Sequence, residues 1–271
     1  MIDLHHRPKK VRDWRDHWDD TRIYETAWMH DNQRSGGQNR FQVPTSRAVD
    51  NPRAALPLDP YVLGVWLGDG TSVRPDLTIG KQDLFIVEEV QRRGYPLHRL
   101  PSAEITWSLG DGTGRVLNAL RTLGVLGAKR VPEQYLSAST EQRLALLRGV
   151  MDTDGTINEN GHVSIDLCNR DLAEGVRRLA ESLGFKATFR TEPATLNGRA
   201  VGTRYRMALA SVDTNPFLLP RKANRWTGPK GQASRATQRT IVSIEKVGTG
   251  PTRCIQVADD SHLFLLEGLI A

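Results

Sequence analysis

The chain has 271 residues, of which 38% are hydrophobic, and its formal net charge is +6 at pH 7. This length allows one large globular domain or two modest ones, and no apolar run is long enough to span a membrane. The first residues, MIDLHHRPKK, lack the apolar core of a secretion signal, so we expect a cytoplasmic protein. Cys168 and Cys254 fit no zinc-binding spacing and are expected to be reduced thiols.

The positive charge is concentrated in one stretch. Residues 186–239 contain 11 Lys and Arg against two acids, Glu192 and Asp213, which gives +9 and leaves −3 for the rest of the chain. Because the neutralisation of successive phosphates is cumulative, such a stretch favours a polyanionic partner such as nucleic acid. A solvated basic surface is the alternative.

Residues 1–53 are polar, with scattered aromatic side chains and a glycine-containing loop at 35–40. This segment is too apolar for a free tail and too short for a domain. Its aromatic residues should therefore pack against another part of the protein.

A repeated unit follows, and each copy opens with an apolar helix that ends in Asp-Gly. The first copy begins DPYVLGVWLGDGT at 59–71, and the second begins RLALLRGVMDTDGT at 143–156. Asp59 before a proline is a common helix start, and Ser139 and Gln142 have the spacing of a capping box. In both copies we expect the glycine after the aspartate to end the helix.

The similarity between the copies continues beyond these helices. Matching strands, amphipathic helices and later strands are predicted at 76–82 and 162–168, at 84–95 and 172–185, and at 103–109 and 203–210. Two copies of a helix with antiparallel strands predict a pseudo-twofold α+β fold.

Asp69 and Asp154 end the two apolar helices, where the helix dipole disfavours a negative charge by roughly 0.3–1 kcal/mol. Small residues recur four apart in both helices and would let the backbones approach closely: Gly64 and Gly68, then Gly149 and Thr153. Close carboxylates repel unless a cation joins them, and oxygen ligands beside a phosphate favour Mg²⁺. One isolated Asp-Gly is usually a turn, but two copies in this setting indicate a metal site.

The two motifs, VLGVWLGDG at 62–70 and LRGVMDTDG at 147–155, resemble the paired signature of LAGLIDADG homing endonucleases of the intein-encoded kind. The first copy departs at its sixth position, where Leu67 replaces the usual acid. The resemblance spans roughly residues 56–225. It implies a LAGLIDADG fold with αββαββα-like repeats, working as a monomer through its internal pseudo-symmetry.

The resemblance also implies which residues hold the metal. Asp69 and Asp154 would bind Mg²⁺ or Mn²⁺, with the backbone carbonyls of Gly68 and Thr153 as additional ligands. A bound metal of this kind activates water for phosphodiester cleavage.

Two lysines are candidates for catalysis. Lys129, in AKRVP, resembles the lysine that precedes the second motif in intein endonucleases and helps catalysis there. Lys222 lies about as far beyond Asp154 as Lys129 lies beyond Asp69, which makes it the symmetric candidate. Either lysine could stabilise charge at the reacting phosphate, and the alternative is a phosphate-contacting or solvated side chain.

The strands of both repeats are expected to form the surface that binds double-stranded DNA. Arg and Lys on a two-stranded ribbon can read guanine in the major groove, although phosphate contact is their commoner role. The candidate DNA-binding residues lie in or beside the strands or in the basic segment after them: Arg74, Lys81, Lys186, Arg190, Arg204, Arg206, Arg221 and Arg225.

The C-terminal segment CIQVADDSHLFLLEGLIA at 254–271 resembles the C-terminal splicing block of inteins. Asp259 and His262 match polar positions of that block, and a polar turn between strands is the alternative. With TIVSIEKV at 240–247, this segment predicts strands joined by tight turns. We expect a small β-rich, HINT-like remnant of a splicing domain at the C-terminus.

The expected organisation has three parts. Residues 1–53 form an intein-derived or linker segment, and residues 221–271 form a basic linker followed by splicing-domain strands. Between them, the endonuclease domain at 54–220 contains repeats at 54–135 and 136–220.

The expected activity is metal-dependent, site-specific cleavage of double-stranded DNA. Two alternatives stay open. One is a cleavage-dead LAGLIDADG protein that binds nucleic acid, and the other is an intein fragment that splices in trans with a separate N-terminal fragment. Met1 offers no splicing nucleophile and Ala271 no cyclising amide, so we expect that this chain does not splice by itself.

Overall fold

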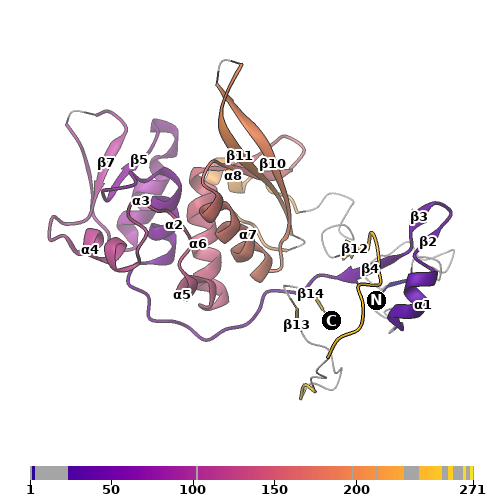
Figure 1. Cartoon of the computed structure of the whole chain (residues 1–271). Coiled ribbons are helices and arrows are strands. Elements are labelled where there is room, and N and C mark those ends of the chain that lie inside the picture. Colours follow the sequence, from indigo (N-terminus) through magenta and orange to yellow (C-terminus); the bar gives the residue numbers. More distant parts are fainter. Residues whose placement is uncertain are drawn as a thin grey trace. The chain divides into compact units, whose positions relative to one another are not determined.

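The computed structural model describes residues 2–3, 24–101, 103–196, 198–211, 213–228, 238–251, 256–258, 265–266 and 269–270. The chain divides into two compact units (Figure 1). One unit joins Met1–Ser46 to Gly231–Ala271, and the other is the continuous stretch Arg47–Lys230. Within the described ranges, no helix combines the length and apolar character needed to cross a membrane.

The continuous unit contains two repeats, and the later repeat has the order αββαββα. Its elements are α6 (Thr140–Thr153), β8 (Gly155–Ile157), β9 (Val163–Leu167), α7 (Arg170–Ser182), β10 (Lys186–Leu196), β11 (Arg199–Ala210) and α8 (Pro220–Ala223), preceded by α5 (Glu133–Leu136). The antiparallel sheet has the order β10-β11-β9-β8. The ribbon of β10 and β11 extends away from the helices (Figure 1).

The earlier repeat has the same strand order with shorter strands. Its elements are α2 (Pro60–Asp69), β5 (Asp76–Thr78), α3 (Leu84–Arg92), β6 (Leu97–Arg99), β7 (Thr106–Leu109) and α4 (Arg115–Thr122). The sheet runs β6-β7-β5, and an antiparallel bridge between Gly70 and Leu77 takes the place that β8 has in the later repeat. The α+β architecture predicted from the sequence is confirmed. The strand predicted at 76–82 is wrong beyond Thr78, because Lys81–Asp83 forms a 3₁₀ turn.

The helices α2 and α6 begin as predicted. The Asp59 carboxylate accepts hydrogen bonds from the backbone N–H groups of Tyr61 (2.9 Å) and Val62 (3.2 Å). Ser139 and Gln142 form a complete capping box. These contacts satisfy N–H groups that the first turn of a helix leaves without partners.

The glycines that follow the two aspartates are needed for a different reason from the one predicted. Gly70 has φ −79° and ψ 149°, and Gly155 lies in β8, so neither glycine adopts the left-handed conformation of a helix C-cap. A Cβ on Gly70 would overlap the carbonyl oxygen and ring of Trp66, and one on Gly155 would overlap Met151. Glycine is required here because the chain turns back tightly against the last turn of its own helix.

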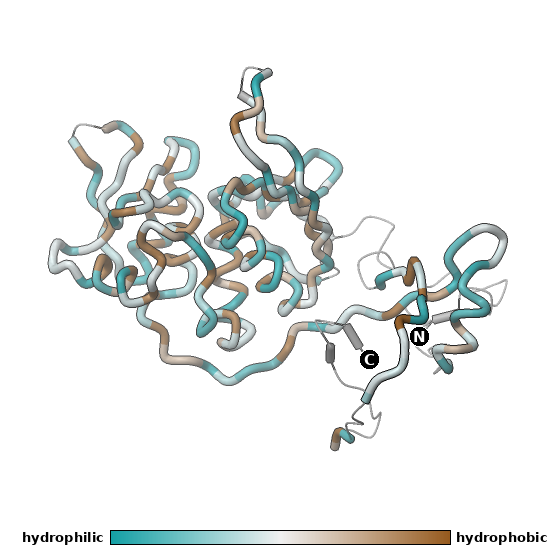
Figure 2. Tube along the Cα trace, in the orientation of Figure 1, coloured by the Kyte–Doolittle hydropathy of each residue, from teal (hydrophilic) through white to brown (hydrophobic). Residues whose placement is uncertain are grey.

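The helices α2 and α6 pack against each other through the middle of this unit (Figure 1). A Cβ on Gly64 would overlap the Leu146 carbonyl oxygen, and one on Gly149 would overlap the Tyr61 carbonyl oxygen. The close approach predicted from the small residues is therefore present. Figure 2 shows hydrophobic positions along these two helices, and Pro60 to Leu67 of α2 are all buried.

The discontinuous unit joins segments from both ends of the sequence in one sheet. Its elements are β1 (Ile2–Asp3), α1 (Thr26–Asp31), β2 (Arg34–Ser35), β3 (Gln38–Asn39), β4 (Phe41–Pro44), β12 (Gln238–Thr240), β13 (Leu265–Leu266) and β14 (Leu269–Ile270). Strand β4 pairs with β1 on one side and β12 on the other. Three aromatic residues of the N-terminal segment pack against one another: Phe41 is buried and contacts the rings of Tyr24 and Trp28.

The strand predicted at 240–247 is wrong beyond its first residue. The backbone N–H of Ile241 still donates to Phe41 O (3.0 Å), but residues 241–250 form no strand. The side-chain amide of Gln33 forms hydrogen bonds with both backbone groups of Ile244. It accepts from the N–H (2.9 Å) and donates to the carbonyl oxygen (3.0 Å). A side-chain amide therefore replaces the strand partner that the prediction assumed.

Candidate functional site

The ends of α2 and α6 bring Asp69 and Asp154 to one site. Asp69 is the last residue of α2, and Asp154 is the C-cap of α6. A Cβ on Gly68 would lie 3.2 Å from Asp154 Oδ2. The carboxylate of the second repeat therefore lies against the backbone of the first motif.

Burial raises the pKa of both carboxyl groups. The pKa of Asp154 rises to about 6 because the group is partly buried and, secondly, because Asp69 lies nearby. Burial also raises the pKa of Asp69, against the opposing effect of the positive charges on Lys129 and Lys222. Two partly buried carboxylates that repel each other favour a shared proton or a bound cation.

Lys129 reaches the end of the first motif from the loop between the repeats. Its Nζ donates hydrogen bonds to the carbonyl oxygens of Gly68 (3.0 Å) and Gly70 (2.6 Å). The same Nζ lies 5.2 Å from the centroid of the Trp66 ring. Burial lowers the pKa of Lys129, and the charges of Asp154 and Asp69 oppose that effect.

Lys222 reaches the end of the second motif from α8. Its side chain is buried, and Nζ donates to the carbonyl oxygens of Met151 (3.0 Å), Asp152 (2.6 Å) and Thr153 (3.1 Å). Burial and, secondly, the neighbouring charge of Arg221 lower the pKa of Lys222 to about 8. The structure thus brings one lysine to each motif, at the two positions singled out in the sequence.

The oxygen atoms at the two motif ends fit a hard divalent cation. The Gly68 and Thr153 carbonyls accept hydrogen bonds from lysines, but each carbonyl oxygen has a second lone pair. Across the described residues, no three His, Cys, Asp or Glu side chains form a metal-binding group. Mg²⁺ fits a site with two carboxylates, because it keeps several waters and takes further ligands from substrate phosphate.

Asp152 is a buried acid that the sequence analysis did not include in the site. Its side chain is 0% exposed, and its carboxylate accepts hydrogen bonds from Tyr61 Oη (2.9 Å) and from the backbone N–H groups of Leu218 and Leu219 (3.0 Å each). Burial raises the pKa of Asp152 to about 6, and these hydrogen bonds oppose the rise. Asp152 occupies the sixth position of the second motif, and Leu67 occupies that position in the first. This difference between the copies is the sequence signal for Asp152.

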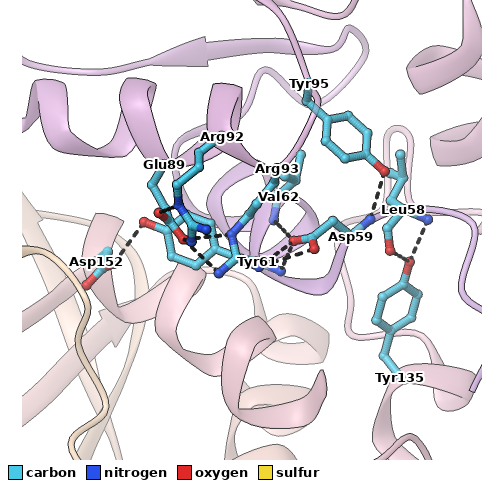
Figure 3. A network of polar contacts seen from close by, with 10 residues as sticks. All are labelled: Leu58, Asp59, Tyr61, Val62, Glu89, Arg92, Arg93, Tyr95, Tyr135 and Asp152. Carbon is cyan, nitrogen blue, oxygen red and sulfur yellow. Dashed lines mark hydrogen bonds and ion pairs between the residues drawn. The ribbon is translucent and has the colours of Figure 1, made fainter. Parts of the chain in front are cut away.

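Tyr61 belongs to a polar network that fixes the start of α2 (Figure 3). The Arg93 guanidinium lies 4.7 Å from the Tyr61 ring centroid and donates to Asp59 Oδ1 (3.1 Å) and Glu89 Oε1 (2.8 Å). Hydrogen bonds from Arg92 and Arg93 lower the pKa of Glu89 in spite of its burial. Through Tyr61, this network connects the first repeat to Asp152 in α6.

The sheet of the second repeat presents arginine and acidic side chains on its outer face. Arg190 and Arg206 lie directly opposite each other on β10 and β11. Arg204 donates to Glu192 across the same ribbon (2.6 Å), and Arg206 lies 3.7 Å from Asp166 on β9. This face carries both hydrogen-bond donors and acceptors.

The other candidate DNA-binding residues are spread over the unit. Arg225 is exposed after α8, and Lys186 begins β10. Ion pairs join Arg74 to Asp76 (3.1 Å), Lys81 to Glu104, and Arg221 to Asp83 (2.5 Å). Asp259 and His262, the predicted splicing-block positions, lie outside the described residues.

The family comparison matches the second repeat. Residues 130–219 match the family model described as homing endonuclease. This match supports a nuclease that acts on DNA. It covers a third of the chain and leaves the first repeat outside it.

Three curated proteins resemble longer parts of the chain. A replicative DNA helicase DnaB of Mycobacterium intracellulare is 34% identical over 82% of this chain and 36% of its own length. An iron-sulfur cluster assembly SufBD family protein of Mycobacterium leprae is 30% identical over 78% of this chain and 28% of its own. The homothallic switching endonuclease of Saccharomyces cerevisiae is 24% identical over 54% of this chain and 31% of its own. The chain spans about a third of the length of these relatives.

Solved structures of the homing endonuclease I-DmoI are also similar to the chain. A mesophilic variant has a TM-score of 0.36 and 15% identity, over 57% of this chain and 88% of that one. A variant in complex with its target DNA and Mn has a TM-score of 0.36 and 14% identity, over 62% of this chain and 90% of that one. Another variant in complex with its target DNA, with Mg, has a TM-score of 0.37 and 14% identity, over 62% of this chain and 92% of that one. TM-scores of this size do not establish a shared fold.

Proposed function

We propose that this chain is a LAGLIDADG-type homing endonuclease that cuts double-stranded DNA at a specific site. The observation that carries the proposal is the pair of carboxylates, Asp69 and Asp154, held together at the ends of two tightly packed helices. Placing two partly buried acids side by side costs stability, so neutral residues would stabilise a fold that had no functional need for the acids. The family match over residues 130–219 supports the same activity.

Each side chain has a role in this proposal. Asp69 and Asp154 would hold a divalent metal, with the carbonyl oxygens of Gly68 and Thr153 beside them. Bound Mg²⁺ or Mn²⁺ would supply Lewis-acid stabilisation of the phosphate and a more acidic water. Lys129 and Lys222 place positive charge at the two motif ends, where the phosphate gains negative charge during cleavage.

The DNA would lie on the outer faces of the two sheets. A two-stranded ribbon such as β10 and β11 is of the kind that the major groove admits. Arg190, Arg204 and Arg206 would donate to base edges or phosphates, while Glu192 and Asp166 hold two of these guanidinium groups in place. The positive charge of residues 186–239 would hold the protein on the duplex.

We also propose that the endonuclease unit is inserted in a splicing domain of the intein kind. Residues on both sides of the continuous unit pair in one sheet through β4 and β12, as expected when one domain interrupts another. The helicase and the iron-sulfur assembly protein have unrelated names, yet each matches most of this chain with about a third of its own length. A module carried inside different proteins explains that pattern.

The test is cleavage of a plasmid library that carries randomised duplex segments. In MgCl₂ the full chain should linearise a small subset of plasmids at one shared sequence, and EDTA should prevent cleavage. Sequencing the ends gives the site. If the protein retains a specific duplex in binding selections but cuts none of the library in Mg²⁺ or Mn²⁺, the cleavage-dead alternative replaces this proposal.

A further inference from the structure

The two motif ends hold their lysines in different ways. Lys129 extends from a loop and is partly exposed, with two carbonyl oxygens of the first motif as its partners. Lys222 is 5% exposed and donates to three carbonyl oxygens of the second motif. Each half of the site therefore has a lysine of its own, and the two lysines differ in how firmly they are fixed.

The helix that carries Lys222 is too short to be stable by itself. Helix α8 contains four residues, and isolated helices of that length do not form in water. Its N-cap is Leu219, and the backbone N–H groups of Leu218 and Leu219 both donate to Asp152 Oδ1. Hydrogen bonds to an ionised acceptor are about twice as strong as neutral ones. The start of α8 is thus fixed by a fully buried carboxylate.

The contacts of Asp152 form a closed loop. Its carboxylate binds the start of α8, and Lys222, one turn later, donates back to the carbonyl oxygen of Asp152 itself (2.6 Å). Tyr61 Oη donates to the other carboxylate oxygen and so connects this loop to α2 (Figure 3). In the first motif the equivalent residue is Leu67, which is apolar and has no acceptor for such a loop.

We infer that Asp152 is a positioning residue that holds Lys222 at the second half of the active site. Asp152 does not touch the reacting atoms; it acts by fixing the backbone from which Lys222 extends. The inference rests on the proposed function in giving Lys222 a part in cleavage. It predicts that the two halves of the site depend on different residues, so that loss of Asp152 impairs one DNA strand more than the other.

The first test measures the position of Lys222 without DNA. The full chain is treated with formaldehyde and a borane reductant, and mass spectrometry follows the methylation of Lys222 relative to Lys129 in the same molecules. Asp152→Leu gives the second motif the residue of the first, and we expect the relative rate at Lys222 to rise by about tenfold, as the loss of buried hydrogen bonds implies. Asp152→Asn keeps one acceptor oxygen and should give a smaller rise.

Two control variants separate positioning from a general loss of stability. Leu179→Ala opens a cavity in the core of the same repeat and should not raise Lys222 labelling selectively, even at an equal fall in Tm. Tyr61→Phe removes the connection to α2 but leaves Leu218 and Leu219 bound, and should leave Lys222 protected. Equal labelling of Lys222 in wild type, Asp152→Asn and Asp152→Leu would overturn the inference, as would a selective rise in Leu179→Ala.

The second test follows each strand of a supercoiled plasmid that carries the selected site. Wild type should give linear product, whereas Asp152→Leu and, more weakly, Asp152→Asn should accumulate nicked circles with one strand intact and duplex affinity unchanged. Equal slowing of both strands would contradict the inference while leaving the proposed function standing. If wild type cuts no DNA, the proposed function fails, and the lysine labelling still decides whether Asp152 positions Lys222.

Discussion

At Asp154, burial and the neighbouring Asp69 raise the folded-state pKa to about 6, from an ordinary value of 3.8. The folded protein therefore binds the proton more tightly than the unfolded chain does. Below about pH 3 both states are protonated and the carboxyl group costs no stability. As the pH rises from about 4 to 6, the unfolded chain ionises first and the stability of the fold decreases.

The ionised Asp154 carboxylate therefore lowers the stability of the fold at neutral pH. Asp154→Asn should raise the free energy of unfolding at pH 7 by about 1–2 kcal/mol in the absence of metal, with almost no gain at about pH 3. Added Mg²⁺ should stabilise wild type but not the variant, because a ligand stabilises the state that binds it. Denaturant titrations at both pH values, with MgCl₂ or EDTA, measure this. A variant less stable than wild type at pH 7 without metal would show that the carboxylate is compensated within the fold.

At the scale of single residues, short motifs and the spacing between repeats pointed to the two carboxylates and the two lysines. They gave no sign of the hydrogen bonds that fix these side chains. Asp69, Asp154, Lys129 and Lys222 could be located because each is tied to a short motif or to the spacing between repeats. The partners of Asp152 lie 66, 67 and 91 residues away in sequence. No local periodicity brings such residues together, so the hydrogen bonds that hold α8 could not be predicted.

Among the elements, the close packing of α2 and α6 fixes the distance between the two carboxylates. Gly149→Ala should destabilise the protein by about 1–3 kcal/mol or more, because its Cβ meets the rigid backbone of Tyr61 and Gly64 rather than a movable side chain. The matched control is Gly80→Ala, where a Cβ meets nothing within 4 Å and φ is −67°. Thermal unfolding of both variants tests the interface, and equal Tm values would contradict it.

Helix starts could be predicted from the sequence, but strand lengths could not. Capping residues act over three positions, so Asp59 and Ser139 marked the starts of α2 and α6. Strand β10 escaped prediction because Pro193 and the charges around it argue against a strand. The structure places β10 at the edge of its sheet, the part of a sheet to which prolines in strands are largely confined.

On the scale of the whole molecule, one unit is made from the two ends of the sequence, and the other unit is the continuous stretch between them. The sequence indicated separate flanks at 1–53 and 221–271, and it could not show that β4 pairs with β12, because nearly two hundred residues separate those strands. We expect residues 47–230 expressed alone to unfold cooperatively, with the circular dichroism of an α+β protein. An unfolded fragment would show that the flanks are needed for folding.

The charge distribution gives a further prediction at this scale. DNA affinity should fall steeply with salt, and Arg190→Ala on the outer face of β10 should reduce the slope of log affinity against log salt by about 1 if Arg190 contacts phosphate. Arg177 on α7 is paired with Glu174 and Glu181, so Arg177→Ala serves as the control and should leave the slope unchanged. Fluorescence anisotropy with the selected duplex measures both slopes. A slope near zero for wild type would argue against DNA as the partner.

The most direct measurement is the single-turnover cleavage rate of the selected duplex by wild type, Asp69→Asn and Asp154→Asn in MgCl₂. Removing either carboxylate should lower the rate by about 100-fold or more while duplex affinity is retained, because the charge that organises the reacting phosphate is lost. Asp111→Asn alters an exposed loop carboxylate held by Thr113 and should cut at the wild-type rate. Cleavage at the wild-type rate by either Asp69→Asn or Asp154→Asn would contradict the assignment of the active site to the two motif ends.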